Sequence, residues 1–111
     1  MRSAVKDLTI STIRESAIRE LTWRGNTVWV QNNLAVRGRK FIGKRGQSDV
    51  IGFRNCDAVM VVCEVKTIGD RLSDDQIKFL NDIKRAGGIA YLACQSATGA
   101  VELREWEGKE K

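Results

Sequence analysis

The chain contains no histidine and no proline, and only three of its 111 residues are cysteine. Without histidine it cannot build a Cys/His zinc site, a histidine general base or a Ser-His-Asp triad. Any catalysis must therefore use carboxylates, lysine or a bound metal. The cysteines show no C-x-x-C spacing and lie in or beside apolar segments, which predicts reduced and buried side chains for Cys56, Cys63 and Cys94.

Long apolar runs are also absent. No segment reaches the roughly 18 consecutive apolar residues that a membrane span requires, and the first residues do not contain the apolar core of a signal peptide. We therefore expect a cytoplasmic protein without membrane contact, in the host cell if a phage encodes it. Low-complexity tracts and internal repeats are missing too, so we expect a single domain over residues 1–111.

Positive charge exceeds negative charge, with 19 Lys and Arg against 14 Asp and Glu, for a formal net charge of +5. Such an excess favours a polyanionic partner. Five cations fall within nine residues that also contain glycine: Arg37, Arg39, Lys40, Lys44 and Arg45. A cationic glycine-containing loop can follow a nucleic-acid backbone. A solvated surface loop has the same composition, so charge alone leaves both interpretations open.

The spacing of apolar residues predicts an α/β fold with the element order α-β-β-β-α-β. Helical periodicity predicts an amphipathic helix over residues 9–24. Runs rich in β-branched residues predict strands over residues 27–31, 48–53, 58–66 and 89–94, with a further short strand over 101–106. The second and third strands are expected to form a hairpin. The third is apolar on both faces, which is typical of a central strand.

The second helix has the clearest start signal in the chain. Ser73 is the expected N-cap, and Gln76 three residues later completes a capping box. Leu72 and Ile77 form a hydrophobic staple around this start. Acidic residues in the first turn and basic residues in the last suit the helix dipole. The helix is expected to end at Gly87-Gly88.

The third predicted strand is apolar for six residues and then ends in Glu64-Val65-Lys66. Because side chains alternate along a strand, Glu64 and Lys66 point to the same face, about 6 to 7 Å apart. The hairpin would place Asp49 across from them. Two carboxylates beside a main-chain carbonyl suit Mg²⁺ or Mn²⁺, and a lysine next to them suits phosphodiester hydrolysis. A solvated strand end with Asp49 in a turn would give the same spacing.

Around these residues the sequence resembles the VRR-Nuc family of the PD-(D/E)XK nuclease superfamily. That family typically shows an early-helix glutamate, then G-x-x-D, then E-x-K, then a helix that opens with L-S-x-x-Q and ends in glycine. The corresponding residues here are Glu15, Gly46 to Asp49, Glu64 to Lys66, Leu72 to Gln76, and Gly87-Gly88. The match covers nearly the whole chain in the right order. The resemblance implies a PD-(D/E)XK (restriction-endonuclease-like) core with a central mixed sheet flanked by helices.

The resemblance also implies roles for the central site residues. Asp49, Glu64 and the main-chain carbonyl of Val65 would bind Mg²⁺ or Mn²⁺. Lys66 would act on the attacking water.

The resemblance implies two further site residues, and each of them has an alternative interpretation. The family's helix glutamate maps to Glu15, for which a direct or water-mediated metal contact is implied, and Glu20 takes its place if the helix register differs. The family's glutamine maps to Gln76, near the lysine. The capping box explains Gln76 without catalysis, so the sequence leaves these two roles open.

For function, the resemblance implies a metal-dependent, structure-specific DNA endonuclease similar to a Holliday-junction resolvase and working as a homodimer. The chain is as compact as a stand-alone member encoded by a phage or mobile element. Two-fold pairing is the simplest way for so short a chain to recognise a branch. Flap or non-specific nucleases, a non-catalytic nucleic-acid-binding module and a small structural subunit are the alternatives.

Aromatic residues give a weaker signal for nucleic-acid binding. Trp23 and Trp29 are suited equally to stacking on bases and to core packing. Phe53 is expected to pack in the core.

Overall fold

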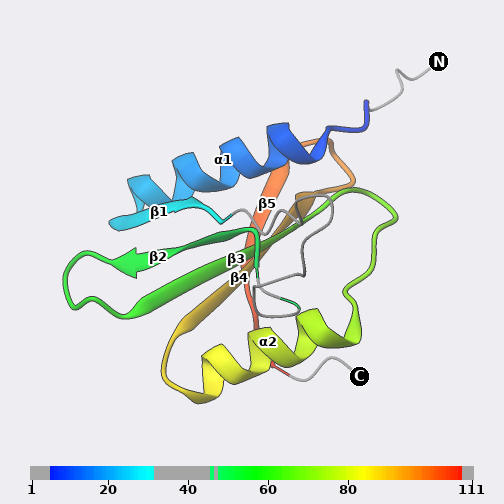
Figure 1. Cartoon of the computed structure of the whole chain (residues 1–111). Coiled ribbons are helices and arrows are strands. Elements are labelled where there is room, and N and C mark those ends of the chain that lie inside the picture. Colours follow the sequence, from blue (N-terminus) through cyan, green and yellow to red (C-terminus); the bar gives the residue numbers. More distant parts are fainter. Residues whose placement is uncertain (1–5, 32–45, 47, 109–111) are drawn as a thin grey trace, which may run out of the picture.

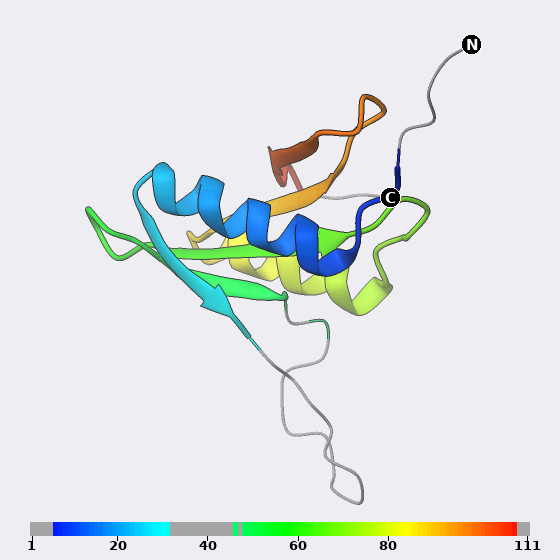
Figure 2. The ribbon, with the colours of Figure 1, turned by 90° about the horizontal axis from the view of Figure 1, so that it is seen from above.

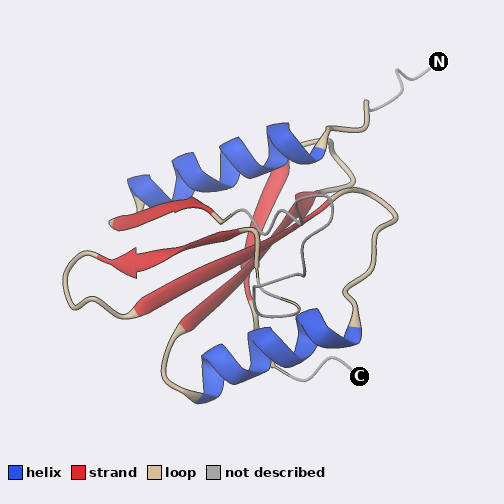
Figure 3. Cartoon of the chain, viewed as in Figure 1, coloured by secondary structure: helices blue, strands red, loops and turns tan. Residues whose placement is uncertain are grey.

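A five-stranded sheet with one helix packed on each face makes up the structure, a computed structural model that describes residues 6–31, 46 and 48–108 (Figure 1; Figure 2). The elements in chain order are α1 (Ile10–Trp23), β1 (Asn26–Val30), β2 (Val50–Arg54), β3 (Met60–Lys66), α2 (Asp74–Arg85), β4 (Ile89–Gln95) and β5 (Val101–Glu105). The predicted α/β class and element order are confirmed, and the expected last strand is present as β5 (Figure 3).

The strands follow one another across the sheet in the order β1-β2-β3-β4-β5. β1, β2 and β3 are antiparallel neighbours, β3 and β4 are parallel, and β5 returns antiparallel to β4. The parallel pair needs a crossover connection, and α2 provides it. β3 is therefore the central strand, as its continuous apolar run predicts, and its residues from Val61 to Val65 are all buried.

Residues of β3 alternate between two separate cores. Three of them share a core with the buried face of α1: Val61, Cys63 and Val65. Val62 points to the opposite face, where it packs with Phe79 and Leu80 of α2. Since Glu64 lies two residues beyond Val62, its side chain is on the α2 face. Lys66 follows on the same face.

Local capping residues begin both helices, and Ser73 is the N-cap that the sequence predicts. Thr9 caps α1, and its side chain accepts a hydrogen bond from the Thr12 amide. Ser73 caps α2 with both bonds of the capping box, from the Gln76 amide to Ser73 Oγ (3.1 Å) and from the Ser73 amide to Gln76 Oε1 (2.9 Å). None of the helices in the described part of the chain is long and apolar enough to cross a membrane.

Two expectations about burial are wrong. Cys56 is exposed, because it occupies the turn between β2 and β3, whereas Cys63 is buried as predicted and Cys94 is partly buried; all three are free thiols. Phe53 is 39% exposed. It lies on β2, while α2 packs against β3 and β4.

Candidate active site

Glu64 is the buried acidic group of the site, with only 2% of its surface exposed. Its Oε2 accepts a hydrogen bond from Gln76 Nε2 at 2.9 Å and lies 3.9 Å from Lys66 Nζ. Its other oxygen, Oε1, has no hydrogen-bond partner within the described residues. A buried oxygen without a partner is costly, so Oε1 is an acceptor that remains available to a ligand.

Asp49 lies directly before β2, where pairing with β1 continues through a hydrogen bond from the Gln31 amide to the Asp49 carbonyl (2.7 Å). Its side-chain Oδ2 accepts a hydrogen bond from the Val65 amide at 3.4 Å. The start of β2 thus meets the end of β3. The hairpin brings Asp49 next to the Glu64-Val65-Lys66 segment.

The Val65 amide shows which way its carbonyl points. In an antiparallel strand, the N–H and C=O of one residue are directed toward the same neighbouring strand. Because the Val65 N–H faces Asp49, the Val65 carbonyl also lies on the Asp49 side. This carbonyl and the two carboxylates are on adjoining strand ends.

Burial makes the Glu64 carboxyl a weaker acid than usual. Desolvation, followed by the negative charge of Asp49, raises the pKa of Glu64 from 4.5 to about 8. The charge of Lys66 and the nearby Ser48 hydroxyl oppose this rise in the pKa. Ser48 Oγ is itself buried and has no hydrogen-bond partner at standard distances and angles within the described residues. A cation bound between the two carboxylates would stabilise the ionised form.

These groups fit a hard divalent metal. Two carboxylates and a main-chain carbonyl are oxygen ligands of the kind that Mg²⁺ and Mn²⁺ bind, and Glu64 Oε1 is buried without a partner among the described residues. The neighbouring thiol is not suited to metal binding, because burial and the charges of Glu64 and Asp49 raise the pKa of Cys63 and this side chain packs in the other core. The fit therefore rests on Asp49, Glu64 and the Val65 carbonyl.

The surroundings of Gly46 show why the G-x-x-D motif has a glycine at this position. Its φ is +75°, and a Cβ on this residue would lie 2.1 Å from the Asp75 carbonyl oxygen and 2.8 Å from the Gln76 nitrogen. The Gly46 backbone therefore lies directly against the first turn of α2. Only glycine allows this approach, which links the segment before Asp49 to the helix that carries Gln76.

The glutamates predicted on the first helix make no contact with this cluster in the part of the chain that the structure describes. Glu15 is exposed on α1, and within the described residues no group of three or more acidic residues or cysteines converges in a way that could hold a metal. Glu20 forms an ion pair with Arg24 (2.8 Å). The five predicted DNA-binding cations, Arg37, Arg39, Lys40, Lys44 and Arg45, lie outside the described residues.

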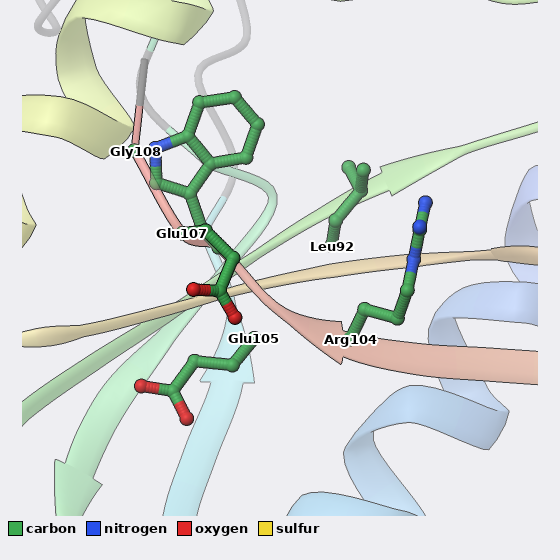
Figure 4. A pocket seen from close by; sticks show the side chains of 6 residues that line it. Leu92, Arg104, Glu105, Glu107 and Gly108 are labelled. Atoms are coloured by element: carbon green, nitrogen blue, oxygen red, sulfur yellow. The ribbon is translucent and has the colours of Figure 1, made fainter. Parts of the chain in front are cut away.

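A hollow of about 400 Å³ lies near the site, across β4 and β5. Leu92, which pairs in register with Glu64, lines it beside Arg104, with Glu105 and Glu107 on the other side (Figure 4). One cation and two carboxylates give this lining a net negative charge, which does not favour a phosphate. The candidate site is therefore the cluster around Asp49 and Glu64, at the ends of β2 and β3.

The α-β-β-β-α-β core carries an acidic pair and a lysine at the adjoining ends of β2 and β3. The model of the VRR-NUC domain family matches residues 34–98, more than half of the chain, and the chain belongs to this family. It is accordingly classed as a nuclease.

A solved structure shares the fold. Hjc, a Holliday junction resolvase from the archaeal hyperthermophile Archaeoglobus fulgidus, superposes with a TM-score of 0.59 over 91% of this chain and 83% of its own, at 18% sequence identity. At this identity the likeness establishes a common fold. Comparison with curated protein sequences finds no match.

Proposed function

We propose that this nuclease is a metal-dependent endonuclease that hydrolyses phosphodiester bonds in branched DNA, as a Holliday-junction resolvase does, and that it acts as a homodimer. The observation that carries the proposal is the meeting of Asp49, Glu64 and Lys66 at the adjoining ends of β2 and β3. Membership of the VRR-NUC family supports nuclease chemistry. The fold of a Holliday junction resolvase supports a branched substrate.

In this proposal Asp49, Glu64 and the Val65 carbonyl hold Mg²⁺ or Mn²⁺. The metal supplies a Lewis acid that lowers the pKa of a bound water and neutralises phosphate charge. Lys66, whose side chain is 17% exposed, orients the attacking water and accepts its proton. Gln76 fixes the Glu64 carboxylate through its 2.9 Å hydrogen bond, so that Glu64 Oε1 faces the ligand.

The remaining predicted residues lie outside the central cluster of Asp49, Glu64 and Lys66 in this proposal. Glu15 is exposed on α1, across the sheet from Glu64, so the family pattern alone supports a direct or water-mediated metal contact for it. The cations between Arg37 and Arg45 bind the DNA backbone, since neutralising phosphates releases counterions. A homodimer offers two such sites related by two-fold symmetry, which matches the symmetry of a four-way junction.

Cleavage assays test the catalytic proposal. The purified chain and its Asp49→Asn, Lys66→Met and Glu15→Gln variants are incubated with four-way-junction, flap and linear DNA in Mg²⁺, Mn²⁺ or EDTA. The junction should be cut with either metal and left intact in EDTA. Asp49→Asn and Lys66→Met should lower the rate by about 100-fold or more. The control is Asp57→Asn, which should leave the rate unchanged, because Asp57 is an exposed carboxyl in the β2–β3 turn.

Several outcomes would contradict the proposal. Cleavage that survives both Asp49→Asn and Lys66→Met would remove the site assignment. Salt-sensitive DNA binding with no cleavage in either metal would favour a non-catalytic binding module. A monomeric mass at micromolar concentration, measured by sedimentation, would contradict the homodimer.

A further inference from the structure

Two exposed aromatic side chains lie together on the sheet. Trp29 on β1 is 48% exposed and Phe53 on β2 is 39% exposed. Their rings meet edge to face, with centroids 6.4 Å apart and planes 68° apart. An edge contact of this kind holds the indole in place and leaves stacking surface on it uncovered.

This pair is on the same face of the sheet as the proposed active site. Trp29 pairs with Ile51, and Ile51 pairs with Val62, so all three side chains point to one face. Val62 packs in the α2 core, and Glu64 follows two residues later on that face. The helix packs against β3 and β4 and does not cover Trp29.

The register also gives the distance. Asp49 precedes Ile51 by two residues, and Ile51 lies directly across from Trp29. With a rise of about 3.4 Å per residue and a strand spacing of about 4.8 Å, the Cα atoms of Trp29 and Asp49 are roughly 8 Å apart. An indole at Trp29 is thus about one nucleotide away from a phosphate bound at Asp49.

Charge identifies the kind of partner. Residues 32–47 contain five cations and no acidic residue. The described residues that flank it, Gln31 and Asp49, lie near Trp29, since the Gln31 amide donates to the Asp49 carbonyl at 2.7 Å and Trp29 pairs with Ile51. An exposed indole near an acidic pair, in a chain whose residues 32–47 carry five cations, suits a partner that carries both phosphates and planar rings.

The exposed apolar area is too small for a stable protein partner. Trp29, Phe53 and the neighbouring Met60 (38% exposed) are the large apolar side chains that are exposed here among the described residues. At about 150 to 250 Å² for a whole aromatic side chain, the exposed parts add up to roughly 300 Å². A stable dimer buries about 800 Å² per partner, so a nucleic-acid base is the better occupant.

We propose that Trp29 is a stacking platform for an unpaired base next to the scissile phosphate, with Phe53 holding its indole ring. The inference rests on the proposed function, because Asp49 marks the place of cleavage. A base inside a duplex is stacked on its neighbours and is not accessible to the indole, whereas a base at a branch point or in a single strand is. Trp29 therefore contributes to the preference for branched or single-stranded DNA over duplex.

Binding in EDTA tests the platform without requiring cleavage. Affinities for an oligo-dT strand, a four-way junction and a linear duplex are measured for the wild-type chain and for Trp29→Thr, Trp29→Phe and Trp23→Ala. Trp23 is the matched control, since it is 87% exposed at the end of α1. Trp29→Thr should weaken oligo-dT binding about 10-fold or more, Trp29→Phe should restore part of it, and Trp23→Ala should leave it unchanged.

Two further readouts separate stacking from a structural role. In a Trp23→Phe chain, Trp29 is the exposed tryptophan that remains, because Trp106 is buried; oligo-dT should quench its fluorescence. Stacking releases no counterions, so Trp29→Thr should lower the affinity without changing the slope of log affinity against log salt. The quenching measurement also applies if Trp29→Thr does not fold.

Wild-type affinity and an unchanged duplex preference in Trp29→Thr would overturn the inference. So would a change from dimer to monomer in that variant with oligo-dT binding intact, since the face would then serve self-association. Oligo-dT binding that depends on Trp29, in a chain that cleaves no DNA, would support the platform and refute the endonuclease. Normal cleavage together with oligo-dT binding that does not depend on Trp29 would support the endonuclease and refute the platform.

Discussion

Gln76 Nε2 donates a hydrogen bond to Glu64 Oε2 at 2.9 Å while Gln76 Oε1 accepts one from the Ser73 amide at 2.9 Å. One side-chain amide therefore completes the helix cap and holds the buried carboxylate. The cap fixes the orientation of the amide, because only the oxygen can accept from a backbone N–H. The sequence left the cap and the site as alternative roles for Gln76, and the geometry contains both contacts at once.

Replacing Gln76 separates the two roles. Gln76→Glu keeps the capping box, since glutamate at this position accepts from the Ser73 amide equally well, but it removes the donor to Glu64 and adds a like charge. In denaturant titrations we expect the free energy of unfolding to fall by about 1 to 3 kcal/mol, because the cap is kept but the buried Glu64 carboxylate loses its donor. We also expect cleavage about 10-fold or more slower.

Ser73→Ala is the matched control for the cap. It should cost about 1 kcal/mol of stability and leave cleavage within a few-fold of wild type, because the Ser73 amide still holds Gln76. Wild-type cleavage by Gln76→Glu would mean that the contact with Glu64 has no catalytic consequence.

The acidity of Glu64 predicts how stability depends on pH in the metal-free protein. Its pKa is raised from 4.5 to about 8, so between these values the folded chain keeps a proton that the unfolded chain releases. The contribution is full below pH 4.5 and is lost as pH rises through 8. The free energy of unfolding in EDTA should therefore fall over this range, by roughly 4 kcal/mol at most.

Urea titrations in EDTA from about pH 5 to about pH 8.5 measure this slope. Glu64→Gln should flatten it, because the amide has no proton to lose and no charge to bury. Added Mg²⁺ or Mn²⁺ should restore stability mainly at the alkaline end, where the ionised carboxylate binds the metal. An equal slope in wild type and Glu64→Gln would assign the pH dependence to other groups.

Elements whose signals are local could be predicted from sequence. The α2 cap depends on residues three apart, and the central place of β3 follows from an apolar run that only a strand covered on both faces tolerates. The hairpin also predicted that Asp49 approaches the end of β3, because register within a hairpin follows from the turn. The predicted element ends differ from the observed ones by no more than two residues.

Contacts that depend on distant packing could not be predicted. Phe53 fits a core strand locally, yet α2 covers β3 and β4 and leaves it partly exposed. The approach of Gly46 to Asp75 joins a loop to a helix far along the chain, and only the family pattern pointed to that glycine. The role of Glu15 stays a prediction.

Gly46→Ala tests that approach. A Cβ at this position would lie 2.1 Å from the Asp75 carbonyl oxygen, on a residue with φ of +75°. Both effects should lower the free energy of unfolding, by about 2 kcal/mol or more in urea titrations. Because the first turn of α2 must move, the Gln76 contact and the cleavage rate should suffer too.

Gly69→Ala provides the control, because Gly69 also has a positive φ (+89°) but nothing lies within 4 Å of its Cβ position. It should cost only the conformational penalty, about 1 kcal/mol. Equal losses in the two variants would show that the contact with Asp75 adds nothing.

Lys66 distinguishes proton transfer from simple charge compensation. Its Nζ lies 3.9 Å from Glu64 Oε2, close enough both to stabilise the ionised carboxylate and to reach a water bound beside it. Lys66→Arg keeps the charge, but a guanidinium stays protonated at any working pH and cannot accept a proton. If Lys66 acts as a base, Lys66→Arg and Lys66→Met should both cleave about 100-fold more slowly or worse in single-turnover assays. Lys66→Met should retain its Mn²⁺ affinity, measured by calorimetry, because it removes no metal ligand and the loss of a nearby cation does not weaken the binding of another cation. Near-normal cleavage by Lys66→Arg would instead assign the residue a purely electrostatic role.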